Sequence, residues 1–285
     1  MEVVTNLDSL REALARFERT GSSTAFVPTM GNLHAGHLSL VERGRALAPV
    51  VIVSIFVNPM QFGANEDLDT YPRTLQADIE KLQAAGVALL FAPNADCIYP
   101  DGAPAHTQVI VPGLTDVLCG ASRPGHFDGV SSIVCKLLNM VAPDVAIFGE
   151  KDLQQLLVIR KMVVDLCLPI RIEGVAIARD TDGLALSSRN VNLSDAEREV
   201  APTLHHCLQA CGKHIQHGAS DFPALCQEAK SNLNAAGFSP DYFEIRRRND
   251  LQPAQPGDKS IAIFAAAQLG QTRLIDNLQL ALSGE

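Results

Sequence analysis

The sequence predicts an α/β fold: a Rossmann-like parallel sheet with helices on both faces, followed by a smaller α+β domain. Apolar segments typical of strands alternate with segments of helical periodicity through about the first 175 residues. Beyond that point two helical patterns precede three strand-like segments, so the order of the elements changes. We therefore expect a Rossmann-like domain at residues 1–175 and a smaller C-terminal domain at residues 176–285.

The composition of the 285-residue chain is that of an ordinary globular protein. Hydrophobic residues make up 47% of the chain and charged residues 19%, which argues against disorder. The formal net charge of −9 argues against a nucleic acid partner. Residues 50–57 form the longest apolar run, too short for a membrane span, and no secretion signal precedes them. Seven cysteines without a CxxC pair indicate reduced thiols, so we expect a cytoplasmic protein with no membrane contact.

The individual elements follow from hydrophobic spacing and from helix-ending residues such as Pro49 and Gly86. Helical spacing is found at residues 8–20, 40–48, 75–85, 130–140, 152–165, 194–217 and 221–236. Strand-like segments are found at residues 24–28, 50–57, 87–91, 107–111, 144–148, 170–178, 242–246, 261–267 and 273–280. In a parallel sheet ligands bind beyond the carboxyl ends of the strands, so polar residues at these ends are the candidates for a site.

The first candidate is a pair of histidines, His34 and His37, between the strand at 24–28 and a helix. Residues three apart lie on one side of a helical turn, and Gly36 between them lets a ligand approach the backbone. The N–H groups at the start of the following helix would favour a phosphate. Because the motif is short, ordinary surface or core histidines remain an alternative at this point.

Further candidates also lie just beyond strand ends. Asn58 and Gln61 are neutral amides suited to a polar substrate, although a polar turn is the alternative. Lys151 follows the strand at 144–148 and suits phosphate oxygens. Residues 186–190 place two hydroxyls and Arg189 in a loop that could close over a triphosphate, or merely cap a helix.

The candidate groups are mainly hydrogen-bond donors and cations. No serine or cysteine nucleophile lies beside a base in the sequence, and the GxxxxGK[ST] phosphate loop is absent. Such a set suits phosphoryl or nucleotidyl transfer, in which positioning and charge neutralisation carry the reaction. Cys207 and Cys211 are spaced to share a zinc ion, but no second ligand-rich segment completes a tetrahedral set. We expect no metal held by the protein itself.

Residues 28–37 resemble the HxGH signature of the nucleotidyltransferase superfamily, and the wider set of motifs resembles the pantothenate synthetase family. The other matching segments are residues 56–62, 123–130, 148–152, 182–190 and 270–277. This resemblance implies ATP-dependent condensation of (R)-pantoate with β-alanine to pantothenate, AMP and pyrophosphate through a pantoyl adenylate. It also implies a homodimer, Mg²⁺ carried on the ATP phosphates, and a fold similar to class I aminoacyl-tRNA synthetases.

The resemblance also assigns residues. Catalytic roles fall to His34, His37 (as proton donor), Lys151 and Arg189. ATP contacts fall to Met30, Gly31, Asn32, Leu33, His34, Ala35, Gly36, His37, Gly149, Glu150, Lys151, Asp152, Ala178, Leu186, Ser187, Ser188 and Arg189. Substrate contacts fall to Gln61, Gln155 and, more weakly, Asn58. The smaller domain would then be a lid that closes over ATP.

Two positions depart from the family pattern: Asn192 stands where a tyrosine is expected, and residues 246–248 are three arginines where the family tends to be acidic. Three other functions remain open at this point. A cytidylyltransferase of the same superfamily would use CTP, a tRNA-ligating relative would need a basic face, and a nucleotide sensor would show no chemistry. The net charge and length disfavour the tRNA-ligating relative.

Overall fold

The computed structural model describes residues 1–63, 66 and 68–282, and these residues form two compact units. Unit 1 consists of Met1–Thr115, Arg123–Glu150 and Gln154–Ala176. Unit 2 consists of Asp116–Ser122, Lys151–Leu153 and the chain from Ile177 onward. Two short segments of the N-terminal part of the chain therefore pack with the C-terminal unit.

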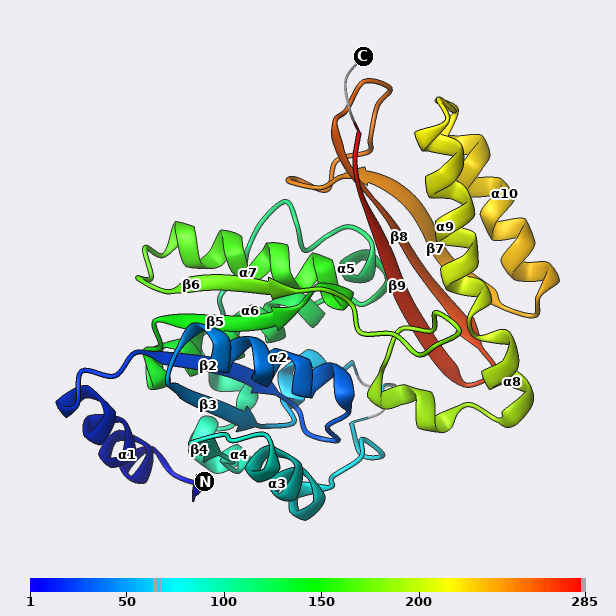
Figure 1. Ribbon diagram of the computed structural model, residues 1–285. Coiled ribbons are helices and arrows are strands. Elements are labelled where there is room, and N and C mark those ends of the chain that lie inside the picture. Colours follow the sequence, from blue (N-terminus) through cyan, green and yellow to red (C-terminus); the bar gives the residue numbers. More distant parts are fainter. Residues whose placement is uncertain (64–65, 67, 283–285) are drawn as a thin grey trace. The chain divides into compact units, whose positions relative to one another are not determined.

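Unit 1 contains a parallel six-stranded sheet in the order β1-β4-β3-β2-β5-β6 (Figure 1). Its strands are β1 (Glu2–Val4), β2 (Thr24–Thr29), β3 (Val50–Ile55), β4 (Leu89–Phe91), β5 (Val145–Gly149) and β6 (Arg171–Val175). From β2 the chain adds β3 and β4 on one side and later β5 and β6 on the other side. The neighbours β2 and β5 therefore mark the point where the strand order reverses. This is the topological switch point, beyond which α/β sheets bind their ligands.

Helices cover both faces of this sheet, as the sequence predicted (Figure 1). Val27 and Val53 pack with buried residues of α2 and α3, while Phe26 and Ile52 point to the opposite face and are also fully buried. The helices and turns of this part of the chain are α1 (Leu7–Arg19), α2 (Ala35–Leu47), η1 (Pro59–Gln61), α3 (Leu75–Ala84), α4 (Ala95–Ile98), η2 (Ala103–Ala105), α6 (His126–Val141), η3 (Glu150–Asp152) and α7 (Leu153–Asp165).

Unit 2 contains an antiparallel three-stranded sheet, with the helices α9 and α10 packed against it (Figure 1). Its core joins Leu208 and Leu233 of the helices to Phe243 and Ile263 of the sheet. The elements are α5 (Cys119–Ser122), η4 (Ser188–Asn192), α8 (Asp195–Val200), α9 (Thr203–Gln216), α10 (Phe222–Ala235), β7 (Ser239–Arg247), β8 (Ser260–Leu269) and β9 (Thr272–Ala281).

Three sequence-based expectations about elements were wrong. Residues 107–111 do not form a strand, because Val109 bonds its backbone to Ser131 and Ser132 side chains of α6. The single helix expected at 194–217 is two helices, α8 and α9, which meet near Pro202, a residue that cannot donate a helical hydrogen bond. The edge strand β1 was not expected, since three residues are too few for a periodic signal.

The cysteine pair considered as a zinc site lies in the core of unit 2. Cys207 and Cys211 are buried in α9, and burial raises the pKa of the Cys211 thiol to about 12. Within the described residues, no group of three or more His, Cys, Asp or Glu side chains is arranged to hold a metal ion. The thiols therefore act as small apolar side chains that pack the helix.

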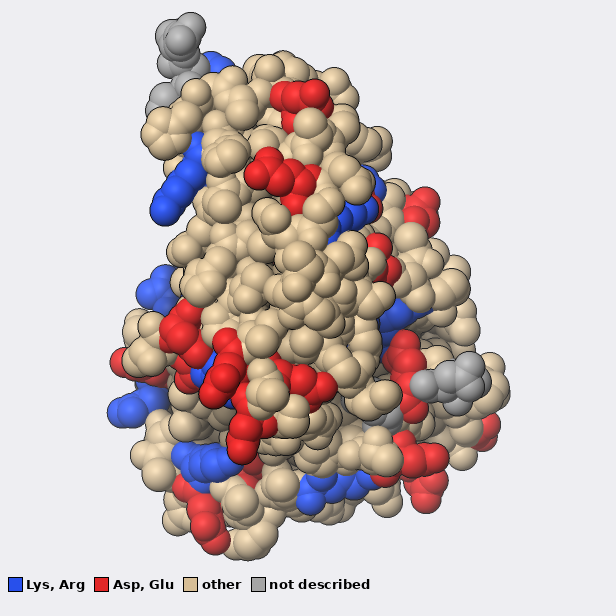
Figure 2. All heavy atoms as spheres, turned by 90° about the vertical axis from the view of Figure 1, so that its right-hand side faces the viewer, with Lys and Arg blue, Asp and Glu red and all other residues tan. Residues whose placement is uncertain are grey.

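The face of the molecule drawn in Figure 2 carries mixed charge. Figure 2 shows acidic and basic side chains interspersed over one face, without a continuous basic stripe across the part of that face that the structure describes. Among the helices of the described residues, none combines the length and apolar character needed to cross a membrane.

Candidate functional site

The turn between β2 and α2 is held by a buried aspartate from α3. Gly31 and Asn32 adopt left-handed backbone conformations (φ 83° and 50°), which turn successive N–H groups to one side. The N–H groups of Asn32 and Leu33 donate to the Asp78 carboxylate at 2.9 and 2.8 Å, and the Thr74 hydroxyl donates at 3.0 Å. Asp78 has no exposed surface. These two amides of the predicted ATP stretch therefore bind a carboxylate of the protein itself.

His34 and His37 cap the start of α2 with their rings. The Gly36 N–H donates to His34 Nδ1 at 3.1 Å, and the His34 N–H donates to His37 Nδ1 at 3.3 Å. The ring centroids lie 4.1 Å apart. Because Nδ1 accepts in both rings, each neutral imidazole carries its proton on Nε2. The fold thus makes Nε2–H a hydrogen-bond donor in both histidines.

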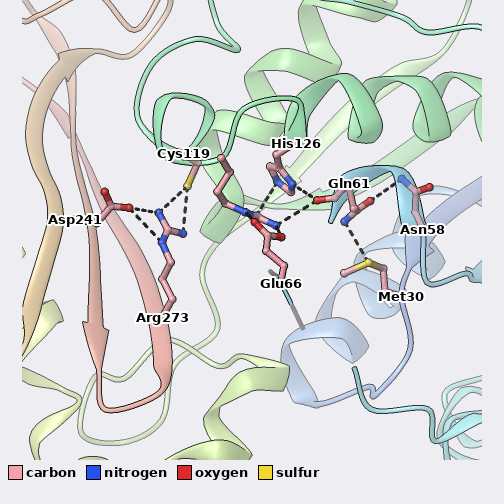
Figure 3. Close-up of polar contacts among 9 residues, drawn as sticks. Met30, Asn58, Gln61, Glu66, Cys119, His126, Asp241 and Arg273 are labelled. Carbon is pink, nitrogen blue, oxygen red and sulfur yellow. Dashed lines mark hydrogen bonds and ion pairs between the residues drawn. The ribbon is translucent and has the colours of Figure 1, made fainter. Parts of the chain in front are cut away.

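Beyond β3, the buried Asn58 side chain bonds to Gln61 of η1 (Figure 3) and to two further segments of unit 1. Its Oδ1 accepts from the Tyr99 hydroxyl at 2.7 Å, and its Nδ2 donates to Gln61 Oε1 and Gly129 O, both at 3.1 Å. Gln61 Nε2 in turn lies 3.2 Å from Met30 Sδ. Burial raises the pKa of the Tyr99 hydroxyl, which keeps it protonated as a donor. Asn58 is therefore placed to orient Gln61, with its own polar atoms engaged by the protein.

Arg123, whose guanidinium could bind an anion, is engaged within unit 1. Its guanidinium forms an ion pair with Glu66 and donates to the Gln61 carbonyl at 3.3 Å. His126 Nδ1 lies 2.8 Å from the same carbonyl (Figure 3). The hydrogen bond from Arg123 holds the pKa of the Glu66 carboxyl below its usual value. A side chain at Gly129 would collide with the backbone of η1, so glycine lets α6 approach this segment.

In unit 2, Lys151 and Ser187 line one small pocket together with Asn190, His205 and Asp276. Ser187 caps η4, and its hydroxyl accepts from the Arg189 N–H at 3.3 Å. The structure thus brings together two of the predicted ATP contacts that lie in separate segments of the sequence. The carbonyl of a third, Ala178, accepts from the Leu186 N–H at 2.9 Å.

The remaining predicted residues lie around the ends of β5 and α7. Gly149 ends β5, and Glu150 and Asp152 belong to the turn η3. Gln155 is half-buried in α7, whereas the neighbouring Gln154 is buried and donates to the Leu114 carbonyl at 2.9 Å. Since β2 and β5 are paired neighbours, the histidine turn and the Gly149 segment follow adjacent strand ends within unit 1.

The two departures from the family pattern lie in unit 2. Asn192 is exposed at the end of η4. Arg246 forms an ion pair with Glu244 and donates to the Leu251 carbonyl, and Arg247 forms an ion pair with Asp250. Neighbouring acids of the same hairpin therefore compensate Arg246 and Arg247.

Sequence reasoning missed four residues that support the candidate site: Asp78, Tyr99, Arg179 and Asp276. A signal existed for two of them. Asp78 stands three residues after Leu75, within the apolar stripe of α3, and Asp276 interrupts the apolar alternation of β9. A charged residue on an apolar face needs partners inside the protein, which is the role that both aspartates have.

Comparison with known proteins gives one consistent result. The family described as Pantoate-beta-alanine ligase matches residues 2–279. The pantothenate synthetases of Pseudomonas aeruginosa (strain UCBPP-PA14) and Hahella chejuensis (strain KCTC 2396) are each 55% identical over 282 residues, covering 99% of this chain and 100% of those proteins.

Solved structures agree. The pantothenate synthetase of Thermus thermophilus has a TM-score of 0.91 at 45% identity, over 98% of this chain and 99% of that one. The pantoate-beta-alanine ligase of Francisella tularensis, complexed with beta-gamma ATP and beta-alanine, has a TM-score of 0.82 at 34% identity, over 100% of this chain and 99% of that one.

Proposed function

The chain belongs to the pantoate–β-alanine ligase family, ATP-dependent enzymes that make pantothenate, and we propose the route and the residues by which it does so. The family, the α/β fold and the ligase function predicted from the motifs are confirmed. The likeness to the Francisella enzyme identifies ATP and β-alanine as two of the substrates. The cytidylyltransferase, tRNA-ligating and sensor alternatives lose their support, since the match to this family spans nearly the whole chain.

In the first step, a carboxylate oxygen of pantoate attacks the α-phosphorus of ATP, a P–O bond forms, and pyrophosphate leaves with the electrons of the broken P–O bond. Negative charge spreads over the phosphates in this step. His34 and His37 donate Nε2–H to phosphate oxygens, while Lys151 and Arg189 supply positive charge. The Nδ1 acceptor roles of both histidines support this assignment, because they fix the proton on Nε2.

The proton-donor role of His37 is best understood as hydrogen-bond donation by a neutral ring. Protonating Nδ1 would remove the acceptor that receives the His34 N–H at 3.3 Å. The ¹⁵N NMR shifts of His37 are expected to show a pyrrole-type Nε2 and a pyridine-type Nδ1 at neutral pH. A pyrrole-type Nδ1, or a ring protonated at both nitrogens, would contradict the assignment.

In the second step, the β-alanine amine attacks the acyl carbon of the pantoyl adenylate, AMP leaves, and the nitrogen loses a proton. Gln61 and Gln155 are proposed to contact the substrates through their amides. For Asn58 we propose orientation of Gln61 in place of direct contact, because its amide already bonds to Tyr99, Gln61 and Gly129.

Several further expectations become proposals. The predicted ATP contacts at residues 30–37, 149–152, 178 and 186–189 form the nucleotide site, with the amides of Asn32 and Leu33 supporting the turn. Mg²⁺ would be bound by the ATP phosphates and would neutralise part of their negative charge. The enzyme is a cytoplasmic homodimer, and residues 176–285 serve as the lid over ATP.

The most direct test of these roles is pantoate-dependent exchange of labelled pyrophosphate into ATP without β-alanine, which isolates the first step. His37→Ala is expected to slow exchange by about 10²–10³, since it removes one donor to the developing charge. His206→Ala, at an exposed position of α9, is the matched control and should leave the rate unchanged. Exchange that needs no pantoate would refute the proposed route, and exchange at the wild-type rate in His37→Ala would refute the role of His37.

A further inference from the structure

Two consecutive buried polar residues of β9, Asp276 and Asn277, contact the two segments of unit 2 that contain proposed ATP residues. They are 5% and 3% exposed. Asn277 Nδ2 donates to the Lys151 carbonyl at 3.0 Å. Asp276 binds the loop that begins at Arg179. A single strand therefore contacts both segments.

Asp276 binds Arg179 through both carboxylate oxygens. Arg179 Nη1 lies 2.7 Å from Oδ2 and Nη2 lies 2.9 Å from Oδ1, which is the paired geometry of a guanidinium fork on a carboxylate. The Asn277 N–H also donates to Oδ1 at 2.8 Å, and His205 Nδ1 lies 3.4 Å from Oδ2. These contacts compensate a charge that would otherwise be costly to bury.

Arg179 also fixes the turn that follows it. Its Nη1 donates to the Gly183 carbonyl at 3.0 Å. Gly183 has φ 94°, and a Cβ there would lie 2.7 Å from a ring carbon of His205, so the turn packs tightly on α9. Beyond the turn, Arg179 and Ala185 pair as an antiparallel bridge. The path of the chain into Ser187 is therefore fixed by the backbone bridge together with the Arg179 side chain.

The loop is also joined to α8 by two exposed ion pairs of Arg198. Arg198 binds Asp180 at 2.9 Å and Asp182 at 2.5 Å, with its own side chain 35% exposed. Ion pairs in such an environment contribute little, because water screens them. The fork of Arg179 and Asp276 is the stronger of the two constraints, because the Asp276 side chain is only 3% exposed and that of Arg179 only 20%.

We propose that Asp276 and Arg179 are positioning residues for the reaction: together they fix the loop of residues 186–189 on the strand that also fixes Lys151. The inference rests on the proposed function, in which this loop and Lys151 bind ATP. Neither residue needs to touch ATP, because each acts through the backbone that it holds. A displacement of about 1 Å in a positioned group can reduce a rate by about 10².

Arg179→Lys tests the inference, because it keeps the charge and removes the fork. We expect kcat/KM for ATP to fall by about 10- to 100-fold, with the KM for β-alanine nearly unchanged. Amide hydrogen exchange in residues 178–190 should become faster, while exchange in β8 stays slow. Arg198→Ala is the matched control, since it removes both exposed ion pairs of the same turn and should change kcat/KM by less than about twofold.

Asp276→Glu and the double variant with Arg179→Lys complete the test. The longer glutamate side chain can reach the shorter lysine side chain. The factor by which kcat/KM for ATP falls in the double variant should therefore be smaller, by about threefold or more, than the product of the factors for the two single variants. If Arg179→Lys does not fold, Asp276→Glu alone supplies the kinetic and exchange measurements. Losses that multiply would show that the two residues act independently, which would overturn the inference.

Arg189→Ala separates this inference from the function on which it rests. If Arg189→Ala reduces kcat/KM for ATP by about 10² while Arg179→Lys only lowers the melting temperature, the positioning role is wrong and the function stands. If Arg189→Ala has no effect, the assignment of the loop to ATP fails, and the positioning inference fails with it.

Discussion

The turn before α2 in unit 1 and the turn at residues 180–183 in unit 2 each depend on a buried aspartate of their own. The two aspartates hold their turns through different interactions. Asp78 accepts from two backbone N–H groups and a hydroxyl, and the nearest cation, Lys81, lies 4.0 Å away. Asp276 instead binds the guanidinium of Arg179 at 2.7 and 2.9 Å.

The difference follows from what each turn has to fix. In unit 1 the carboxylate bonds directly to the backbone before His34, which leaves little freedom for the ring that caps α2. In unit 2 the carboxylate fixes a side chain, and that side chain then holds the Gly183 carbonyl. The direct bonds give precise backbone geometry, whereas the ion pair spans a longer loop at the cost of burying two charges.

Asp276→Ala should have the largest effect on stability. It leaves the Arg179 charge without its partner, and breaking a buried pair costs about 3–5 kcal/mol. We expect the lower end of this range, because the Arg179 side chain is 20% exposed to solvent. Denaturant unfolding measures the change, with Arg247→Ala, which removes an exposed pair with Asp250, as the control. Equal effects of the two variants would contradict the role of burial.

The same ion pair predicts a pH dependence of stability. Burial alone would raise the pKa of the Asp276 carboxyl, but His205 and Arg179 outweigh burial and hold that pKa below its ordinary value. The carboxylate therefore stabilises the fold above its unfolded pKa of about 3.9, and this contribution is lost as the pH falls further. The melting temperatures of the wild type and Asp276→Asn should differ most near pH 7 and converge below about pH 4. A difference in melting temperature that stays constant with pH would contradict the stabilising role of the ionised Asp276 carboxylate.

Asp78→Asn should have a smaller effect on stability and a clear effect on activity. The amide keeps one accepting oxygen but turns an NH₂ group towards the other backbone donor. One buried N–H of Asn32 or Leu33 then lacks a partner, which costs about 1–3 kcal/mol. The pyrophosphate exchange rate should fall because the His34 ring moves with the turn. Glu80→Gln, the same change at an exposed position of α3, is the control and should be neutral.

Tyr99→Phe should have the smallest effect. It removes the 2.7 Å hydrogen bond to Asn58 and keeps the ring contacts with Phe56 and His106. The loss of one neutral hydrogen bond costs about 1 kcal/mol, which corresponds to roughly fivefold in the KM for pantoate if Asn58 orients Gln61. An unchanged KM in a variant with reduced stability would show that Asn58 serves the fold alone.

Much of the fold could be predicted, because hydrophobic spacing directly reports which faces are buried. The strand at residues 50–57 and the helix at 75–85 follow from this spacing, and the structure contains both as β3 and α3. The spacing did not show that residues 107–111 bond to side chains of α6, since hydrogen bonds to Ser131 and Ser132 leave no periodic pattern.

The support of the candidate site was harder to predict than its motifs. His34, His37 and Lys151 stand beside strand ends and are visible in the sequence. Asp78 lies 45 residues from Leu33, and Asp276 lies 97 residues from Arg179, so only the fold brings each aspartate to its turn. Their positions on apolar faces marked them as buried charges, but a sequence does not say which donors will reach them.

The central claim, that ATP activates pantoate as an adenylate, is tested most directly by oxygen-18 labelling of both pantoate carboxylate oxygens. Attack by one of these oxygens on the α-phosphorus transfers it to the nucleotide when AMP leaves. Activation through a pantoyl adenylate predicts one labelled oxygen in each AMP and one in the amide carbonyl of pantothenate. Unlabelled AMP, or label in pyrophosphate, would contradict it.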